Sequence, residues 1–164
     1  MQEQETQVKI VRPQTGLVRR FANNLITFKA TAANTYGIYS LFEISTPSRD
    51  GMLPHLHWYE DETFWVLEGM YRFLFGVEAL DLGVGGYVFV PRGILHSFTN
   101  HGSSTARMLS LVTPGGIHER FFAEASKPAI ESGEVLKPPD PSELVRIIKI
   151  ARKYGIEMLQ PPNA

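Results

Sequence analysis

Residues 51–69 read Gly51-Met-Leu-Pro-His-Leu-His-Trp-Tyr-Glu-Asp-Glu-Thr-Phe-Trp-Val-Leu-Glu-Gly69, and residues 85–100 read Gly85-Gly-Tyr-Val-Phe-Val-Pro-Arg-Gly-Ile-Leu-His-Ser-Phe-Thr-Asn100. Side chains two positions apart in a strand share one face, so His55 and His57 can point the same way. Glu62 opens the next apolar run. If the strand with His55 and His57 pairs with this run as an antiparallel hairpin, Glu62 lies close to His57. A third neighbouring strand would deliver His96 to the same place. The spacing predicts one cluster of three imidazoles and a carboxylate.

This ligand set is typical of a metal site. Neutral imidazole nitrogens and carboxylate oxygens suit divalent first-row metals. Burying such a cluster without a metal would leave polar groups unpaired, at a cost of about several kcal/mol. We therefore expect one divalent transition metal per chain, which can be Fe, Mn, Ni, Co or Zn, with Cu possible. Four protein ligands on a five- or six-coordinate ion leave positions open for chemistry.

Other acidic and histidine side chains compete for a place in the site. Glu60 and Asp61 fall in the expected turn and are predicted to be solvated loop charges. Glu68 is expected at the rim, beside the turn at Gly69. His101 is predicted to lie in a loop and His118 on an exposed helix, so neither is expected to be a ligand.

At these residues the sequence resembles the cupin superfamily. The segment from His55 to Gly69 follows the pattern H-x-H-x4-E-x6-G, and that from Gly85 to Asn100 follows G-x5-P-x-G-x2-H-x3-N. The resemblance implies an all-β fold, a cupin-type double-stranded β-helix or jelly-roll barrel with one or two C-terminal helices. It also implies that the metal ligands are His55, His57, Glu62 and His96.

A narrower resemblance extends over the rest of the chain. Residues 113–116 and 154–162 are arranged as in single-domain bacterial cupins grouped with quercetin 2,3-dioxygenase. This implies an enzyme: a metal-dependent dioxygenase that cleaves a flavonol-like or other enolic or aromatic small molecule with O₂. Glu62 would also be the catalytic base that takes a hydroxyl proton. Two alternatives are another metal cupin enzyme of the isomerase or decarboxylase type, and a metal-containing small-molecule binding protein without turnover.

Aromatic residues near the expected inner face can form the wall of a pocket for a flat ligand. The alternative, which should hold for at least half of them, is that they are plain core. The candidates for the pocket are Phe42, Phe64, Tyr71, Phe73 and Phe98.

Length and composition narrow the function classes. The 164 residues suit one domain, with residues 1–6 disordered, a barrel over about 8–113 and a helical extension over about 114–164. The 16 basic and 17 acidic side chains give a net charge of −1, which argues against nucleic-acid and membrane surfaces as partners. The polar N-terminus is not a signal peptide, and no apolar run approaches the ~20 residues of a membrane span. We expect a cytoplasmic protein.

Strands are expected at residues 8–11, 25–29, 36–46, 63–67, 71–75, 87–90 and 94–99, and a final long one at 106–112. Residues 63–67 and 71–75 have the signature of a hairpin turning at Gly69. A helix is expected around Ile117 and Phe121, and a second has Asp140 as its N-cap. Because a strand at 8–11 would leave an unpaired sheet edge, we expect a homodimer.

Overall fold

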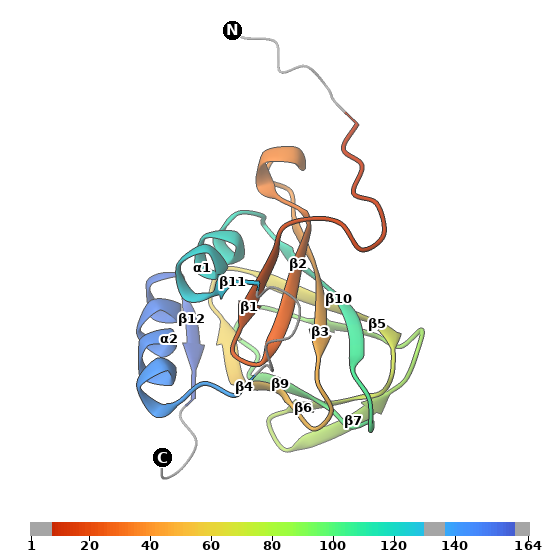
Figure 1. Ribbon diagram of the computed structural model, residues 1–164. Helices are drawn as coiled ribbons and strands as arrows, with labels where there is room; N and C mark the ends of the chain where they lie inside the picture. Colours follow the sequence, from red (N-terminus) through yellow and green to blue (C-terminus); the bar gives the residue numbers. More distant parts are fainter. Residues whose placement is uncertain (1–7, 130–136, 160–164) are drawn as a thin grey trace, which may run out of the picture.

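The computed structural model describes residues 8–129 and 137–159. The expected disorder of residues 1–6 lies outside these ranges. Two antiparallel sheets face each other, and two helices lie on one flank (Figure 1). This is the expected all-β jelly-roll barrel with C-terminal helices.

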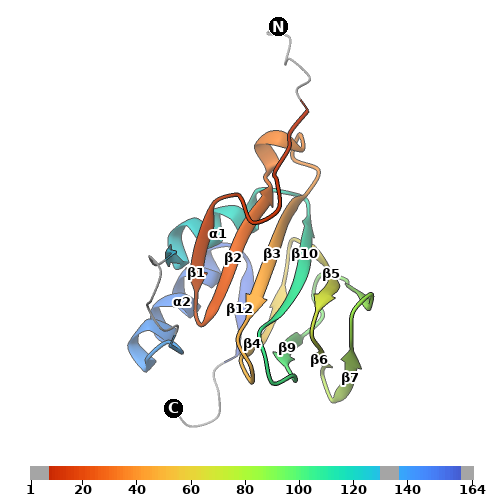
Figure 2. The ribbon, with the colours of Figure 1, turned by 45° about the vertical axis from the view of Figure 1, so that its right-hand side comes forward.

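The larger sheet contains seven strands in the order β11-β1-β2-β3-β10-β5-β8. Figure 2 shows β1, β2, β3, β10 and β5 side by side. The strands at 40–46 and 106–113 alternate strictly between buried and partly exposed positions, as strands with one face on a core do. A short 3₁₀ turn, η1 (Ala32–Asn34), links two of them. The seven strands are β1 (Val18–Phe21), β2 (Asn24–Ala30), β3 (Ser40–Thr46), β5 (Asp61–Glu68), β8 (Tyr87–Val90), β10 (Ala106–Thr113) and β11 (Lys127–Pro128).

The smaller sheet contains five strands in the order β12-β4-β9-β6-β7. In this sheet, β4 lies between β9 and β12, the last strand of the described chain. Because β4 and β9 carry the histidines of both sequence motifs, their pairing positions the site. The five strands are β4 (Gly51–His57), β6 (Tyr71–Phe75), β7 (Glu78–Leu82), β9 (His96–Asn100) and β12 (Ile156–Met158).

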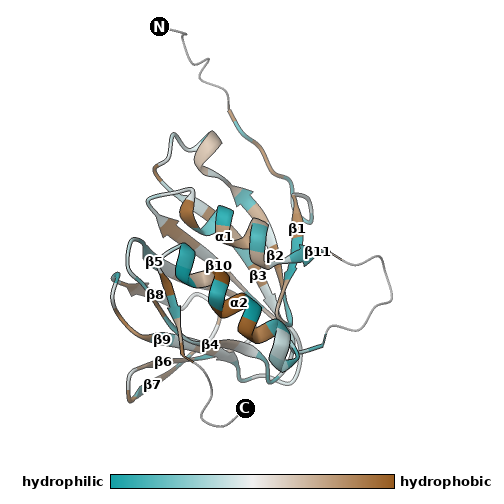
Figure 3. Ribbon diagram, turned by 90° about the vertical axis from the view of Figure 1, so that its left-hand side faces the viewer, coloured by the Kyte–Doolittle hydropathy of each residue, from teal (hydrophilic) through white to brown (hydrophobic). Residues whose placement is uncertain are grey.

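Two helices pack against each other, and they also contact β12 and β1. Figure 3 shows α1 (Ile117–Ala125) and α2 (Pro141–Lys153) side by side on one flank. The expected N-cap of α2 is confirmed, since the Asp140 carboxylate accepts the Glu143 N–H at 2.9 Å. Gly155 has φ +70° and turns the chain from α2 into β12, where an added Cβ would meet the Tyr59 ring. In the described ranges no helix is long and apolar enough to cross a membrane.

Several local expectations were wrong. Residues 8–11 form no strand, which removes the sheet edge from which dimerisation was inferred. The strand expected at 36–46 begins only at Ser40, so Tyr36 and Ile38 precede β3, and both are exposed. The segments at 63–67 and 71–75 do not pair as a hairpin, because β5 and β6 belong to different sheets. The strand at 106–112 is not the last one, since β12 follows the helices.

Candidate metal centre

The two histidine strands lie side by side. His55 of β4 is directly opposite His96 of β9 in the antiparallel register, and His57 lies two positions further along β4. The alternation of the strand therefore places His55 and His57 on the same inward face. This pairing confirms the expected third strand.

Glu62 reaches the same point from the other sheet. It lies on β5, which pairs with β10 and β8 and not with β4. The expected hairpin between the two segments was therefore wrong. The chain turns at residues 58–60 and crosses from one sheet to the other, so Glu62 faces the histidines across the barrel interior.

The four side chains converge in the core. Each is buried, and their nearest donor atoms all lie within 4.8 Å of one another. Glu62 Oε2 lies 3.1 Å from His57 Nε2 and 3.2 Å from His96 Nε2. Such separations are what two ligands about 2.0–2.2 Å from one ion would show. The cluster can hold a metal.

The imidazoles of His55 and His96 are each oriented by a contact at Nδ1. His55 Nδ1 contacts the Leu53 carbonyl at 2.8 Å, and His96 Nδ1 contacts the Ile94 carbonyl at 2.9 Å. A carbonyl only accepts, so Nδ1 carries a proton in both rings, and in a neutral ring this leaves the Nε2 lone pair available to a metal. On the other side, the Ser110 hydroxyl donates to Glu62 Oε1 at 2.6 Å.

One polar atom tests whether a metal fits. His57 Nε2 is one of three buried side-chain polar atoms without a hydrogen-bond partner in the described part of the chain. It lies 3.1 Å from Glu62 Oε2, an ion-pair distance, but makes no hydrogen bond to it. An orphaned buried nitrogen is costly, and a metal ion at this point would satisfy it. The residues therefore fit a divalent ion.

The charges of the cluster are strongly coupled. Burial lowers the pKa of His55 well below 6.5, and His96 and His57 add to that effect. Burial also opposes the charged form of His57, but the Glu62 and Glu60 carboxylates outweigh it and raise its pKa to about 9. Although burial alone would raise the pKa of Glu62, His57 and His96 hold it well below 4.5.

A second buried group adjoins the first and was missed in the sequence. Glu60 is only 1% exposed, so its prediction as a solvated loop charge was wrong. Its Oε2 lies 3.4 Å from His57 Nδ1 and 3.1 Å from His118 Nδ1. His118 is buried on α1 rather than exposed, because this face of the helix packs on the centre. His57, Glu60 and His118 form a second group with metal-binding geometry.

The remaining competitors lie outside the centre. The Asp61 carboxylate accepts two hydrogen bonds from the Arg92 guanidinium, which lower its pKa to about 2. Glu68 lies at the exposed end of β5 and pairs with Arg107. His101 is exposed. None of these three side chains belongs to either buried group.

The five candidate pocket aromatics are all buried. Phe64, Tyr71, Phe73 and Phe98 contact one another edge-on or tilted, with ring centroids 5.3–6.3 Å apart. Phe42 packs instead against Phe122 and His118 of α1. Only Phe98 of the five lines a cavity at the metal centre.

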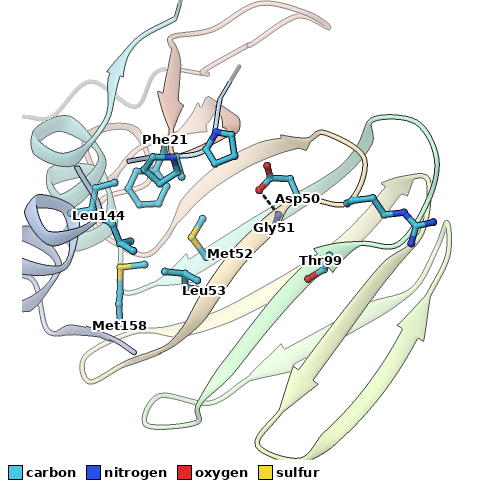
Figure 4. A pocket seen from close by; sticks show the side chains of 13 residues that line it. Phe21, Asp50, Gly51, Met52, Leu53, Thr99, Leu144 and Met158 are labelled. Carbon is cyan, nitrogen blue, oxygen red and sulfur yellow. Dashed lines mark hydrogen bonds between the residues drawn. The ribbon is translucent and has the colours of Figure 1, made fainter. Parts of the chain in front are cut away.

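Two cavities lie near the centre. The inner one holds about 30 Å³ and is lined by His55 and Glu62 among apolar side chains. The outer one holds about 340 Å³ and lies between β4 and α2 (Figure 4). Its walls are mostly apolar, with Asp50 at one end hydrogen-bonded to the backbone of Gly51.

Comparison with known proteins agrees with this geometry. The family described as "Cupin domain" matches residues 42–112, which contain all four converging residues. The matched region, residues 42–112, is a cupin domain, and the fold around it agrees.

Proteins similar to this chain in sequence or in fold carry diverse names. Over 134 residues, 80% of the chain, it is 27% identical to quercetin 2,3-dioxygenase of Bacillus subtilis. That match spans only 38% of the Bacillus protein. A predicted oxalate decarboxylase from Thermotoga maritima has the same fold, with a TM-score of 0.60 and 18% identity over 63% of this chain and 97% of that one. The polyketide cyclase RemF from Streptomyces resistomycificus has a TM-score of 0.57 and 22% identity over 65% of this chain and 79% of its own.

Proposed function

We propose that this cupin is a metal-dependent dioxygenase that acts on an enolic or aromatic small molecule. One divalent transition metal per chain would be held by His55, His57, Glu62 and His96. The observation that carries the proposal is the convergence of four buried donor side chains, among them a His57 Nε2 that makes no hydrogen bond. When bound, the metal supplies Lewis-acid and, for a redox-active ion, one-electron chemistry.

The protein side chains provide the proton transfer. Ser110 donates to Oε1 of Glu62, and Oε2, the oxygen nearest His57 and His96, would accept the proton of a substrate hydroxyl. Glu62 lines the inner cavity, where mostly apolar walls exclude bulk water. The backbone carbonyls of Leu53 and Ile94 prevent His55 and His96 from rotating away during this transfer.

Similarity supports the reaction class. The match to quercetin 2,3-dioxygenase extends over 80% of this chain, beyond the two motifs. Because the match spans 38% of that enzyme, its activity and substrate are transferred here only as part of the proposal. Fold likeness to a decarboxylase and a cyclase does not favour either activity, since one fold hosts many.

Metal content and oxygen uptake test the proposal together. The protein is prepared metal-free and reconstituted in turn with Fe, Mn, Co, Ni, Cu and Zn. His96→Ala removes a proposed ligand, and His101→Ala is the matched control because that histidine is exposed. We expect about one metal per chain in wild type and His101→Ala, and its loss in His96→Ala. Oxygen uptake is then measured with quercetin and with 2,3-dihydroxynaphthalene, a smaller aromatic diol.

Each outcome decides something. Uptake that depends on the metal and disappears in His96→Ala supports the dioxygenase. Bound metal without uptake for any ion rejects oxygenation and leaves an isomerase, a decarboxylase or a binding protein. Failure of every ion to bind would refute the metal centre itself.

A further inference from the structure

The two cavities share a wall. Phe21, Met52 and Met158 line both the inner cavity at the metal centre and the outer one beside α2. Figure 4 shows these three side chains at one side of the outer cavity, together with Leu53 and Leu144. The cavities are therefore neighbours separated by a single layer of side chains.

The inner cavity is too small for an organic substrate. Its volume of about 30 Å³ has room for about two water molecules. A hydroxyl oxygen or a diatomic gas fits there, but an aromatic ring does not. The bulk of any ring-containing substrate must therefore lie outside this space.

The outer cavity has the size and lining of a ligand site. Its volume of about 340 Å³ lies at the lower end of the roughly 300–1,000 Å³ typical of small-molecule pockets. Leu53, Leu144 and Ile147 give it an apolar surface that suits a flat ring. The small volume favours one or two rings over the three rings of a flavonol.

The shared wall contains the side chains most able to move. Methionine has three rotatable bonds and adapts its shape at low cost. Met52 lies where the β4–β9 register is interrupted, between Met52 and His55. Such an irregularity redirects side chains beside many active sites. Met158 is opposite His55 in the β4–β12 pair.

We propose that the outer cavity binds the ring system of a one- or two-ring phenol or enol, whose hydroxyl passes between Met52 and Met158 to reach the metal centre. This inference rests on the proposed function for the identity of the reactive group. The assignment of the outer cavity as a binding chamber rests only on its volume and lining. Met52, Met158 and Phe21 then select substrates by the width of the passage.

The test is a substitution that fills the chamber from the side away from the metal centre. Leu144 lines only the outer cavity, whereas Val145 is 56% exposed on the same helix. Leu144→Trp should therefore block the chamber, and Val145→Trp is the matched control. The probe is 2,3-dihydroxynaphthalene, followed by its own fluorescence with metal-free and zinc-loaded protein. Azide, followed by the visible spectrum of the cobalt-loaded protein, reports on the inner cavity alone.

We expect Leu144→Trp to weaken binding of the naphthalenediol at least tenfold in both forms, with metal content and azide affinity unchanged. Val145→Trp should leave naphthalenediol binding, metal content and azide affinity unchanged. Equal affinity in Leu144→Trp and wild type, or no binding to wild type, would overturn the chamber. If Leu144→Trp fails to fold, Leu53→Ala serves instead. By enlarging the chamber it should tighten quercetin binding at least threefold, and an unchanged affinity counts against the proposal.

Metal uptake and diol binding distinguish a failure of the chamber hypothesis from a failure of the proposed function. A protein that takes up no metal refutes the metal centre, yet the naphthalenediol still tests the chamber in the metal-free form. A protein that binds metal and binds the diol regardless of residue 144 refutes the chamber alone.

Discussion

Glu60 and His118 lie 58 positions apart, yet Oε2 of the carboxylate is 3.1 Å from Nδ1 of the imidazole. Oε1 of the same carboxylate accepts the backbone N–H of His118 at 3.0 Å. Because Gly116 gives α1 no side-chain cap, Glu60 fills that role from another element. The same carboxylate faces His57 Nδ1, so α1 is fastened to the metal centre through a single buried residue.

Glu60→Gln should weaken metal binding. The carboxylate holds His57 in the tautomer that turns Nε2 to the centre, and loss of such an outer partner typically costs about 10- to 100-fold in metal affinity. We expect a loss of this size in a competition titration with a chromophoric chelator. Glu157→Gln, in which the carboxylate is exposed, is the control and should match wild type. An unchanged affinity in Glu60→Gln would show that Glu60 does not orient His57.

A different variant, His118→Gln, tests the second buried group. If His57, Glu60 and His118 hold an ion of their own, wild type will bind two metals per chain. His118→Gln should then reduce the stoichiometry to one. We expect one metal in both proteins, because His57 Nδ1 is occupied as a donor to Glu60.

Stability of the metal-free protein should fall as pH rises from 6.5 to 9. The pKa of His57 is raised from 6.5 to about 9 in the fold, so protonation stabilises the fold. That contribution is complete below pH 6.5 and is lost as pH rises through about 9. Because a metal needs the neutral ring, metal binding strengthens over the same window.

Thermal denaturation with and without zinc measures both trends. The metal-free Tm of wild type, relative to His57→Gln, should decrease between pH 6.5 and 9. The Tm gain on adding zinc should increase over the same range. A difference between the two proteins that does not change with pH would contradict the assignment.

Asp140→Ala should destabilise the protein by about 1 kcal/mol, typical for loss of an N-cap. Its side chain accepts the Glu143 N–H, and alanine leaves that group without a partner in the protein. Urea denaturation measures the loss. Asp140→Asn keeps an acceptor and should lie within a few tenths of a kcal/mol of wild type. Equal stability of all three proteins would mean that the N-terminus of α2 is frayed.

A homodimer stays a prediction, now with a different surface. Trp65, Tyr87 and Phe89 are exposed on the outer side of β5 and β8, and β8 ends the larger sheet in the described part of the chain. Exposed aromatic patches beside a free strand edge favour association. Sedimentation at micromolar concentration should show a dimer for wild type and a monomer for Phe89→Glu. Val84→Glu, on an exposed loop, should remain dimeric, and monomeric wild type would refute the prediction.

Local patterns predicted the converging residues well. Strand alternation requires only neighbouring residues, so the inward face shared by His55 and His57 was readable from their spacing. The Asp140 cap was equally local, because an N-cap and its helix are adjacent in the chain. The two motifs also predicted the family and the barrel.

Long-range pairing was not readable in the same way. Gly69 joins two apolar strands, a pattern that suits a hairpin, yet each strand pairs within its own sheet. Strand partners depend on which faces pack across the whole barrel, and the sequence on either side of a turn carries little of that information. For the same reason β12, short and remote in sequence, escaped prediction beside β4.

The sequence by itself determined the donor atoms of the centre, because residue type and a period of two are local properties. Only the tertiary structure decided that Glu62 approaches from the opposite sheet and that Glu60 and His118 are buried behind His57. It also decided that a chamber lies beyond Met52. Burial, charge coupling and cavity volume arise from surfaces that meet only after sheets and helices have packed, so no stretch of sequence contains them.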